Sequence, residues 1–360
     1  LIFILFIYII IKLISKSEKR FKFLNTFFIF FSLTKFVIPN VNHSELKSSF
    51  INESRNNQSS NLFDNISKKK SPVIFIILDE LSSSSEIFNY TNDTLDLEFD
   101  KKLTELGFNS FPVFKSLSNR TKYSLPSIFN FNLHNSKKTL EIEKNDNNNL
   151  VKQSVINNNF LKSFKKNLLL DSLTKKNIKY NSYGLVSFYN ESKKLDYHIW
   201  DLITSNTRDN LLNRLLTPTV FGFIKVLILG ESGKTFQNYN KEVLSSLKLL
   251  EPESDNFYYF HFYAPHEPHE FFDEFRSDNS LSFFENHIRF KRFFLPKILN
   301  TLKKDKFNNS RIIISGDHGL RLFSFIDEYK TSLYLKGYDN INNVNDFSVQ
   351  DLGYLIHESF

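Results

Sequence analysis

Arg311-Ile312-Ile313-Ile314-Ser315-Gly316-Asp317-His318-Gly319 is the stretch of this 360-residue chain that decides its fold. The apolar run is typical of a buried strand that ends in a turn. A carboxylate and an imidazole follow it directly, and an open α/β sheet presents its ligand-binding side chains at the carboxyl ends of its strands. Asp317 and His318 are therefore candidate metal ligands at a sheet edge, and a metal site is predicted when a second strand of the same kind supplies further ligands.

A second apolar strand has the same design, because the run from Val73 to Leu78 leads straight into Asp79 and Glu80. Further strand-like runs alternate with helix-like stretches along the chain, which predicts an α/β sandwich around a largely parallel central sheet. The predicted strands are Val73–Asp79, Phe108–Phe114, Ile178–Val186, Phe257–Tyr263, Arg311–Ser315 and Ser332–Lys336, and the predicted helices are Leu95–Leu106, Val155–Leu173, Lys241–Leu250 and Phe283–Leu302.

Composition narrows the classes of function. The chain has no Cys, which excludes disulfides, cysteine-bound zinc and thiol nucleophiles. Its net charge of +7 comes from Lys residues scattered among Asp and Glu, so we expect a solvated surface and no nucleic-acid partner. The segment Gly230–Thr235 resembles a phosphate loop, but Ile228 stands where that motif needs Gly, so we expect no nucleotide.

Hydropathy divides the chain into three parts. Two apolar runs lie within residues 1–39, and the basic residues between them fit a loop on the cytoplasmic side of a membrane. We expect a transmembrane anchor there, truncated because the chain begins with Leu. A buried helical hairpin and a secretory signal are the alternatives. Residues 40–71 are polar and predict a linker, and residues 72–360 predict one domain outside the cytoplasm.

Two more segments carry candidate chemistry. In Thr121-Lys122-Tyr123-Ser124-Leu125-Pro126, the proline suits the first turn of a helix, and Thr121 would lie just before it. The amides of a helix N-terminus favour an anion or a developing alkoxide there. In the second segment a predicted strand runs out into a loop with His266 and His269, where ligands and acids are found. A capped surface helix and incidental histidines are the alternatives.

In this order the pieces resemble the sulfatase-like branch of the alkaline phosphatase superfamily, and in particular membrane-anchored phosphoethanolamine transferases and lipoteichoic acid synthases. The resemblance runs from about Val73 to the C-terminus. It implies an alkaline-phosphatase-like sandwich, here preceded by transmembrane segments. It also implies that domain 72–360 is a sulfatase-like catalytic domain on the outer side of the cell membrane.

The resemblance also implies roles for single residues. Asp79, Glu80, Asp317 and His318 match the metal ligands of the family. The matching ions are divalent, and the mixed carboxylate and imidazole set favours zinc, with manganese, calcium and magnesium as alternatives. Thr121 stands three positions before the Ser of Ser124-Leu125-Pro126, as the nucleophile of the transferases does. Ser124 matches the sulfatase nucleophile, although Ile128 stands where sulfatases have Arg.

The implied reaction is hydrolysis or transfer of a phosphate or sulfate ester of an envelope lipid or glycan, through a covalent Thr121 or Ser124 intermediate. His266, and less surely His269, would stabilise the transferred group or protonate the leaving oxygen. The alternative function is a membrane-tethered pseudoenzyme that uses the same fold for binding or regulation.

Overall fold

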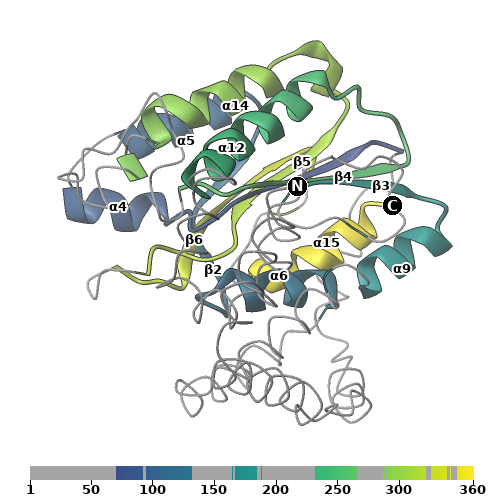
Figure 1. Ribbon diagram of the computed structural model, residues 1–360, viewed down its shortest axis with the longest axis horizontal. Coiled ribbons are helices and arrows are strands. Elements are labelled where there is room, and N and C mark those ends of the chain that lie inside the picture. The colour runs from purple at the N-terminus through teal and green to yellow at the C-terminus, as the bar shows by residue number, and fades with distance from the viewer. Residues whose placement is uncertain are drawn as a thin grey trace, which may run out of the picture. The chain divides into compact units, whose positions relative to one another are not determined.

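A single six-stranded β-sheet organises the described part of the chain (Figure 1). Its strands are β1 (Val73–Leu78), β2 (Asn109–Lys115), β3 (Lys179–Tyr183), β4 (Asn256–Phe262), β5 (Arg311–Gly316) and β6 (Lys330–Lys336). They lie in the order β2-β6-β5-β1-β4-β3. Strand β6 is antiparallel to both of its neighbours, and all other pairs are parallel. The prediction of a mixed α/β fold with a largely parallel sheet is confirmed.

This computed structural model describes residues 70–91, 95–131, 164, 167–184, 188, 232–265, 287–288, 290–321, 326–338, 341 and 347–360. The predicted anchor, residues 1–39, and nearly all of the predicted linker, residues 40–71, lie outside these ranges. Within them, no helix is both long enough and apolar enough to cross a membrane.

The middle strands of the sheet are completely buried. Every residue of β1, β4 and β5 is buried, as their almost unbroken apolar sequences predict for parallel strands covered on both faces. Strand β2 lies at an edge and is mostly exposed, and a register shift interrupts its pairing with β6 between Phe111 and Phe114. Pro112 falls within that interruption, at an edge where a missing backbone N–H does least harm.

Helices cover both faces of the sheet in two layers (Figure 1). One layer holds α4 (Ser84–Thr91), α5 (Leu95–Glu105), α12 (Ser232–Leu249) and α14 (Leu295–Leu302), and the other holds α6 (Thr121–Phe129), α9 (Leu168–Lys175) and α15 (Leu352–Glu358). A π-helical turn, η4 (Phe290–Phe294), leads into α14, and two 3₁₀ turns are η5 (Asp305–Phe307) and η6 (Val349–Asp351). The apolar side chains between the layers and the sheet form one large core cluster.

Helix α6 begins earlier than its sequence predicts. It starts at Thr121, and Pro126 lies inside it instead of in its first turn. The N–H groups of Tyr123 and Ser124 both donate to the Arg120 carbonyl, so one helical turn is already closed before the proline. Only the hydrogen bond that Pro126 cannot donate is lost. Thr121 therefore occupies the first helical position, where backbone amides are without helical acceptors.

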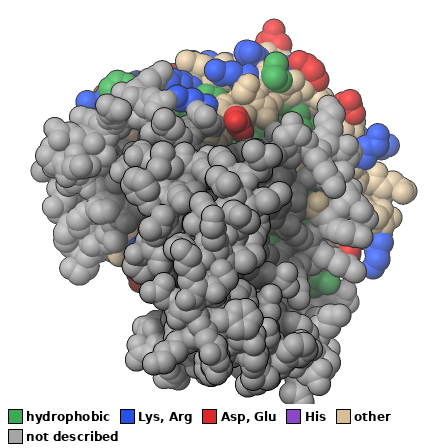
Figure 2. All heavy atoms as spheres, viewed as in Figure 1, with side chains coloured by type: hydrophobic (Ala, Val, Ile, Leu, Met, Phe, Trp, Pro, Cys, Tyr) green, Lys and Arg blue, Asp and Glu red, His purple; other side chains and the backbone are tan. Residues whose placement is uncertain are grey.

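Charges on the described surface are mixed. On the face shown in Figure 2, Lys and Arg side chains lie interspersed with Asp and Glu side chains. This part of the surface agrees with the scattered charge of the sequence and shows no single-sign patch.

Candidate metal centre and active site

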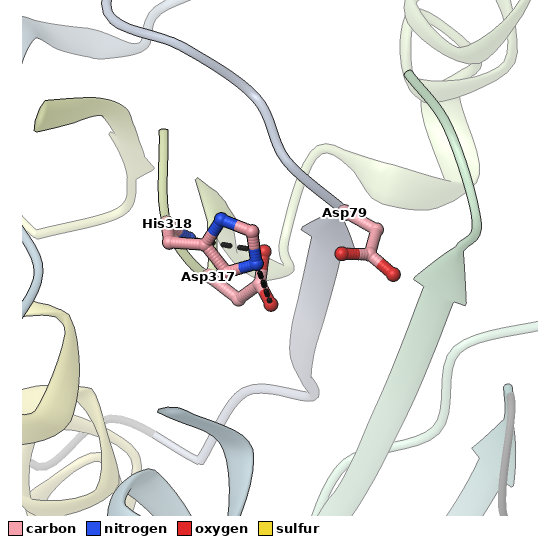
Figure 3. Close-up of side chains that lie close together, drawn as sticks. All are labelled: Asp79, Asp317 and His318. Carbon is pink, nitrogen blue, oxygen red and sulfur yellow. Dashed lines mark hydrogen bonds and ion pairs between the residues drawn. The ribbon is translucent and has the colours of Figure 1, made fainter. Parts of the chain in front are cut away.

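The register of the sheet brings two acidic segments together. Leu78, the last residue of β1, pairs with Gly316, the last residue of β5. The next residues along each strand, Asp79 and Asp317, therefore leave the sheet side by side at its carboxyl edge. Figure 3 shows Asp79 at the end of β1, with Asp317 and His318 beside it.

These three side chains form a candidate metal centre. One ligand atom from each of Asp79, Asp317 and His318 lies within 4.8 Å of the other two, and all three residues are fully buried. In the described part of the chain this is the only such group of His, Asp and Glu residues. Two carboxylates and an imidazole are a ligand set that zinc and similar divalent ions accept.

The tautomer of His318 fits a metal ligand. Its Nδ1 lies 2.8 Å from the carbonyl oxygen of Gly319, which can only accept, so Nδ1 carries the proton of the neutral ring. Nε2 then presents its lone pair toward Asp317 Oδ2, 3.4 Å away (Figure 3). A lone pair facing a carboxylate oxygen is unfavourable unless a proton or a cation lies between them. A histidine ligand that donates its other N–H to a backbone carbonyl is the usual arrangement around protein-bound metals.

The surroundings of the Asp317 carboxylate also favour a bound cation. Burial raises the pKa of its carboxyl, and the nearby Asp79 carboxylate raises it further, whereas His318, His261 and the amide of Glu80 lower it. Asp317 Oδ2 has no hydrogen-bond partner among the described residues. A divalent cation would offset the cost of burying these charges and would use the unpaired oxygen, so the residues present fit a metal ion.

Thr121 points its hydroxyl into this centre. Its Oγ1 donates to Asp79 Oδ1 at 2.9 Å and lies 3.3 Å from His318 Nε2. The N-terminus of α6 thus places a hydroxyl between the ends of β1 and β5. A hydroxyl next to a carboxylate and an imidazole is in a position to be activated as a nucleophile.

Glu80, the fourth predicted ligand, lies outside the group of three. Its backbone has a φ of 64°, which turns the chain sharply after β1 and lets its amide donate to Asp317 Oδ1 at 3.0 Å. Its carboxylate accepts from Arg321 Nε at 2.8 Å. Glu80 therefore fixes Asp317 through its backbone and pairs with Arg321 through its side chain. No role was predicted for Arg321, although a cation four residues after Asp317 was a signal for one.

Ser124, the second predicted nucleophile, is engaged elsewhere. Its hydroxyl donates to the carbonyl oxygen of Asp317 at 2.8 Å and accepts from Gln350 Nε2 at 3.1 Å. Ser116 donates to the same carbonyl at 2.8 Å, and Gln350 also contacts Ser116. This network holds the Asp317 backbone in place from the α6 and η6 side. Nothing in the sequence around Gln350 indicated such a contact.

One histidine comes to the site from β4. His261 is fully buried, and its Nε2 lies 3.5 Å from Asp79 Oδ2. No role was predicted for His261, and its signal in the sequence was a single imidazole inside an apolar strand. His266 and His269, to which the sequence analysis gave roles, lie outside the described residues.

The fold and these contacts define an α/β protein with a buried group of two carboxylates and an imidazole at the carboxyl edge of its sheet, and a threonine hydroxyl in contact with that group. No protein-family model and no curated protein matches the chain.

Solved structures with a similar arrangement exist at low sequence identity. The soluble domain of lipooligosaccharide phosphoethanolamine transferase A from Neisseria meningitidis is 12% identical, with a TM-score of 0.44, over 81% of this chain and 89% of that one. The lipoteichoic acid synthase from Listeria monocytogenes is 11% identical, with a TM-score of 0.41, over 79% and 72%. A protein in the alkaline phosphatase superfamily from Vibrio parahaemolyticus is 10% identical, with a TM-score of 0.38, over 80% and 70%.

The chain is similar to these three structures, and one of them is described as a member of the alkaline phosphatase superfamily.

Proposed function

We propose that this chain is a metal-dependent enzyme that hydrolyses or transfers phosphate or sulfate esters through a covalent intermediate on Thr121. The observation that carries this proposal is the position of Thr121 Oγ1, which contacts both Asp79 and His318 of the candidate metal centre. A hydroxyl in contact with a buried set of candidate metal ligands is an arrangement that supports nucleophilic catalysis on an ester.

Asp79, Asp317 and His318 would hold the ion, and zinc is the metal that their ligand types favour. When bound, a divalent cation lowers the pKa of a neighbouring hydroxyl and polarises the oxygen of the ester. The Glu80–Arg321 ion pair lies next to the ligands, so Glu80 supports the centre from outside the group of three.

The chain's own residues supply the remaining steps. The proton of the Thr121 hydroxyl moves along its hydrogen bond to Asp79 Oδ1, while Oγ1 forms a bond to the phosphorus or sulfur of the donor. The bond to the leaving oxygen breaks, and that oxygen keeps the electron pair and takes a proton from His266. An acceptor hydroxyl or water then attacks the same atom and gives its proton to His266, the bond to Thr121 breaks, and Asp79 returns its proton to Thr121 Oγ1. The amides at the start of α6 favour negative charge at Thr121 throughout.

The proposed substrate is a lipid or glycan of the cell envelope that bears phosphate or sulfate. In this proposal residues 1–39 hold the chain in the membrane and residues 72–360 act outside the cytoplasm. Two apolar segments around a basic loop support this arrangement, and so does the sequence resemblance to membrane-anchored transferases.

Mass spectrometry of the full chain, purified in detergent with zinc and incubated with candidate phosphate and sulfate esters, tests the proposal. We expect an adduct on Thr121. Thr121→Ala should give no adduct and should lower turnover by at least about a thousandfold, because the nucleophile is gone. Its zinc content should stay near that of the wild type, because the three proposed ligands remain.

Ser124→Ala is the matched control on the same helix. It should keep the Thr121 adduct and lose about 1–3 kcal/mol of unfolding free energy, because two buried hydrogen bonds are removed, one to the Asp317 carbonyl and one from Gln350 Nε2. Full turnover in Thr121→Ala, or an adduct on Ser124, would overturn the assignment of the nucleophile. A wild-type chain without stoichiometric metal would favour the alternative, a binding protein with the same fold.

A further inference from the structure

His261 is an imidazole that the proposed reaction does not use, although it lies against the candidate metal centre. It is fully buried in β4, among the aromatic side chains of that strand. It pairs in register with Ile77 of β1, two residues before Asp79. Burying an imidazole costs free energy unless its ring nitrogens find polar partners, so its contacts require an explanation.

Each ring nitrogen of His261 faces one polar group. Nδ1 lies 3.1 Å from the hydroxyl of Tyr259, which points to the same side of β4 because it is two residues away. Nε2 lies 3.5 Å from Asp79 Oδ2 and has no hydrogen-bond partner among the described residues. Burial keeps the pKa of Tyr259 well above its usual range, so its hydroxyl stays protonated and is able to donate.

These contacts select one tautomer. When Tyr259 donates to Nδ1, the proton of the neutral ring lies on Nε2, which then points an N–H toward Asp79. The distance of 3.5 Å is longer than the roughly 2.7–3.2 Å of a good N–H···O bond, so the attraction is mainly electrostatic in this geometry. The two oxygens of Asp79 thereby face different partners, with Oδ1 toward Thr121 and Oδ2 toward His261.

The surrounding backbone is shaped to hold His261 in this place. The hydroxyl of Tyr239, on α12, donates to the His261 carbonyl at 2.6 Å. On the other side Gly184 follows β3, and a Cβ there would lie only 2.9 Å from the Cβ of His261. Any side chain at position 184 would therefore clash with His261, and glycine avoids this clash.

We propose that His261 is a positioning residue for Asp79, and that the series Tyr259–His261–Asp79 fixes the plane of this metal-binding carboxylate. The inference rests on the proposed function, because it assumes that Asp79 holds an ion and accepts the proton of Thr121. Groups that orient a metal ligand from behind contribute about 10–100-fold to metal affinity or activity.

Zinc binding to the full chain in detergent, measured by competition with a chromogenic chelator, tests this inference. His261→Phe keeps the ring volume and removes the N–H, so we expect zinc affinity to fall about 10–100-fold and kcat to fall more than KM rises. His261→Gln restores a side-chain N–H and should recover most of the affinity. Tyr259→Phe should give a smaller loss, because Asp79 keeps its neighbour but the tautomer is no longer fixed.

Each outcome bears on one claim. Thermal unfolding of the metal-free proteins identifies a variant that fails to fold, in which case Tyr259→Phe and His261→Gln carry the test. Equal zinc affinity in His261→Phe and the wild type, with a clear loss in Asp79→Asn, would overturn the inference and leave the proposed function standing. If zinc affinity falls in His261→Phe and falls equally in His261→Gln, His261 would be a direct ligand, and this outcome also overturns the inference. Absence of zinc binding in the wild type would overturn both.

Discussion

Asp79 and Glu80 are neighbours in the sequence with the same charge, yet their carboxylates have different surroundings. Asp79 faces Thr121 and His261, whereas Glu80 faces Arg321. The backbone conformation of Glu80 explains the difference. Its positive φ turns the chain just after β1 and directs its side chain away from that of Asp79. At the scale of the residue, the site therefore depends on backbone conformation as much as on residue type.

Substitutions that remove one charge at a time should distinguish the roles of these two carboxylates. Asp79→Asn should lower zinc affinity by more than about 100-fold, because a proposed ligand loses its charge, while Glu80→Gln should lower it by about 10–100-fold, the scale of an indirect contact. Chelator competition on the full chain measures both. Equal losses would show that Glu80 binds the ion directly, as the sequence resemblance implies.

At the scale of the element, the placement of Thr121 depends on how α6 packs. Its neighbour α15 approaches so closely that a Cβ at Gly353 would overlap the carbonyl oxygen of Ile128, on α6. Gln350, in the turn before α15, also holds Ser124 of α6. The C-terminal segment thus supports the helix that carries the proposed nucleophile, which no local pattern in either segment indicates.

Gly353→Ala should therefore disturb both stability and activity. We expect a loss of about 1–3 kcal/mol in unfolding free energy, because the added methyl group forces α15 away from α6, and a fall in turnover because Thr121 moves with α6. Urea unfolding and the ester assay measure the two effects. Leu249→Ala, at a position 77% exposed on α12, is the control and should stay within about 0.5 kcal/mol of the wild type. Wild-type stability in Gly353→Ala would contradict the close packing.

The whole molecule buries several tyrosines, and this predicts sensitivity to alkali. Burial raises the pKa of Tyr338 to about 12, although its hydrogen bond with Ser359 and the nearby Arg311 act in the opposite direction. In the unfolded chain the Tyr338 hydroxyl ionises near pH 10. Between pH 10 and 12 the folded state therefore keeps a proton that the unfolded state loses, and the free energy of unfolding falls as pH rises through that window. Below about pH 10, Tyr338 is protonated in both states and makes no contribution to the pH dependence of the unfolding free energy.

Tyr338→Phe should flatten this dependence. Relative to its value at pH 9, the unfolding free energy of the wild type should fall by about 2 kcal/mol more than that of the variant at pH 12. Denaturant unfolding at a series of pH values measures this. Parallel curves for the two proteins would show that Tyr338 does not ionise differently in the folded and unfolded states.

Much of the fold could be predicted from the sequence, because strands and helices leave local patterns of apolar and polar residues. The prediction included all six strands of the sheet to within a few residues. The signal was clearest for β1, β4 and β5, since buried parallel strands have almost continuous apolar sequences. Helix boundaries were less readable, and α6 shows the reason. A proline is a strong signal for a first turn, but the turn closed by Arg120 comes before it and moves the start of the helix to Thr121.

What the sequence determined by itself is the set of chemical groups: two strands ending in Asp79 and in Asp317-His318, and Thr121 before a proline. Local pattern suffices there, because residue type and position after a strand limit what a side chain can do. Only the tertiary structure decided how these groups are paired. Glu80 faces Arg321, Ser124 holds the Asp317 carbonyl, and His261 lies behind Asp79, because strand register and helix packing bring together residues that are far apart in the chain.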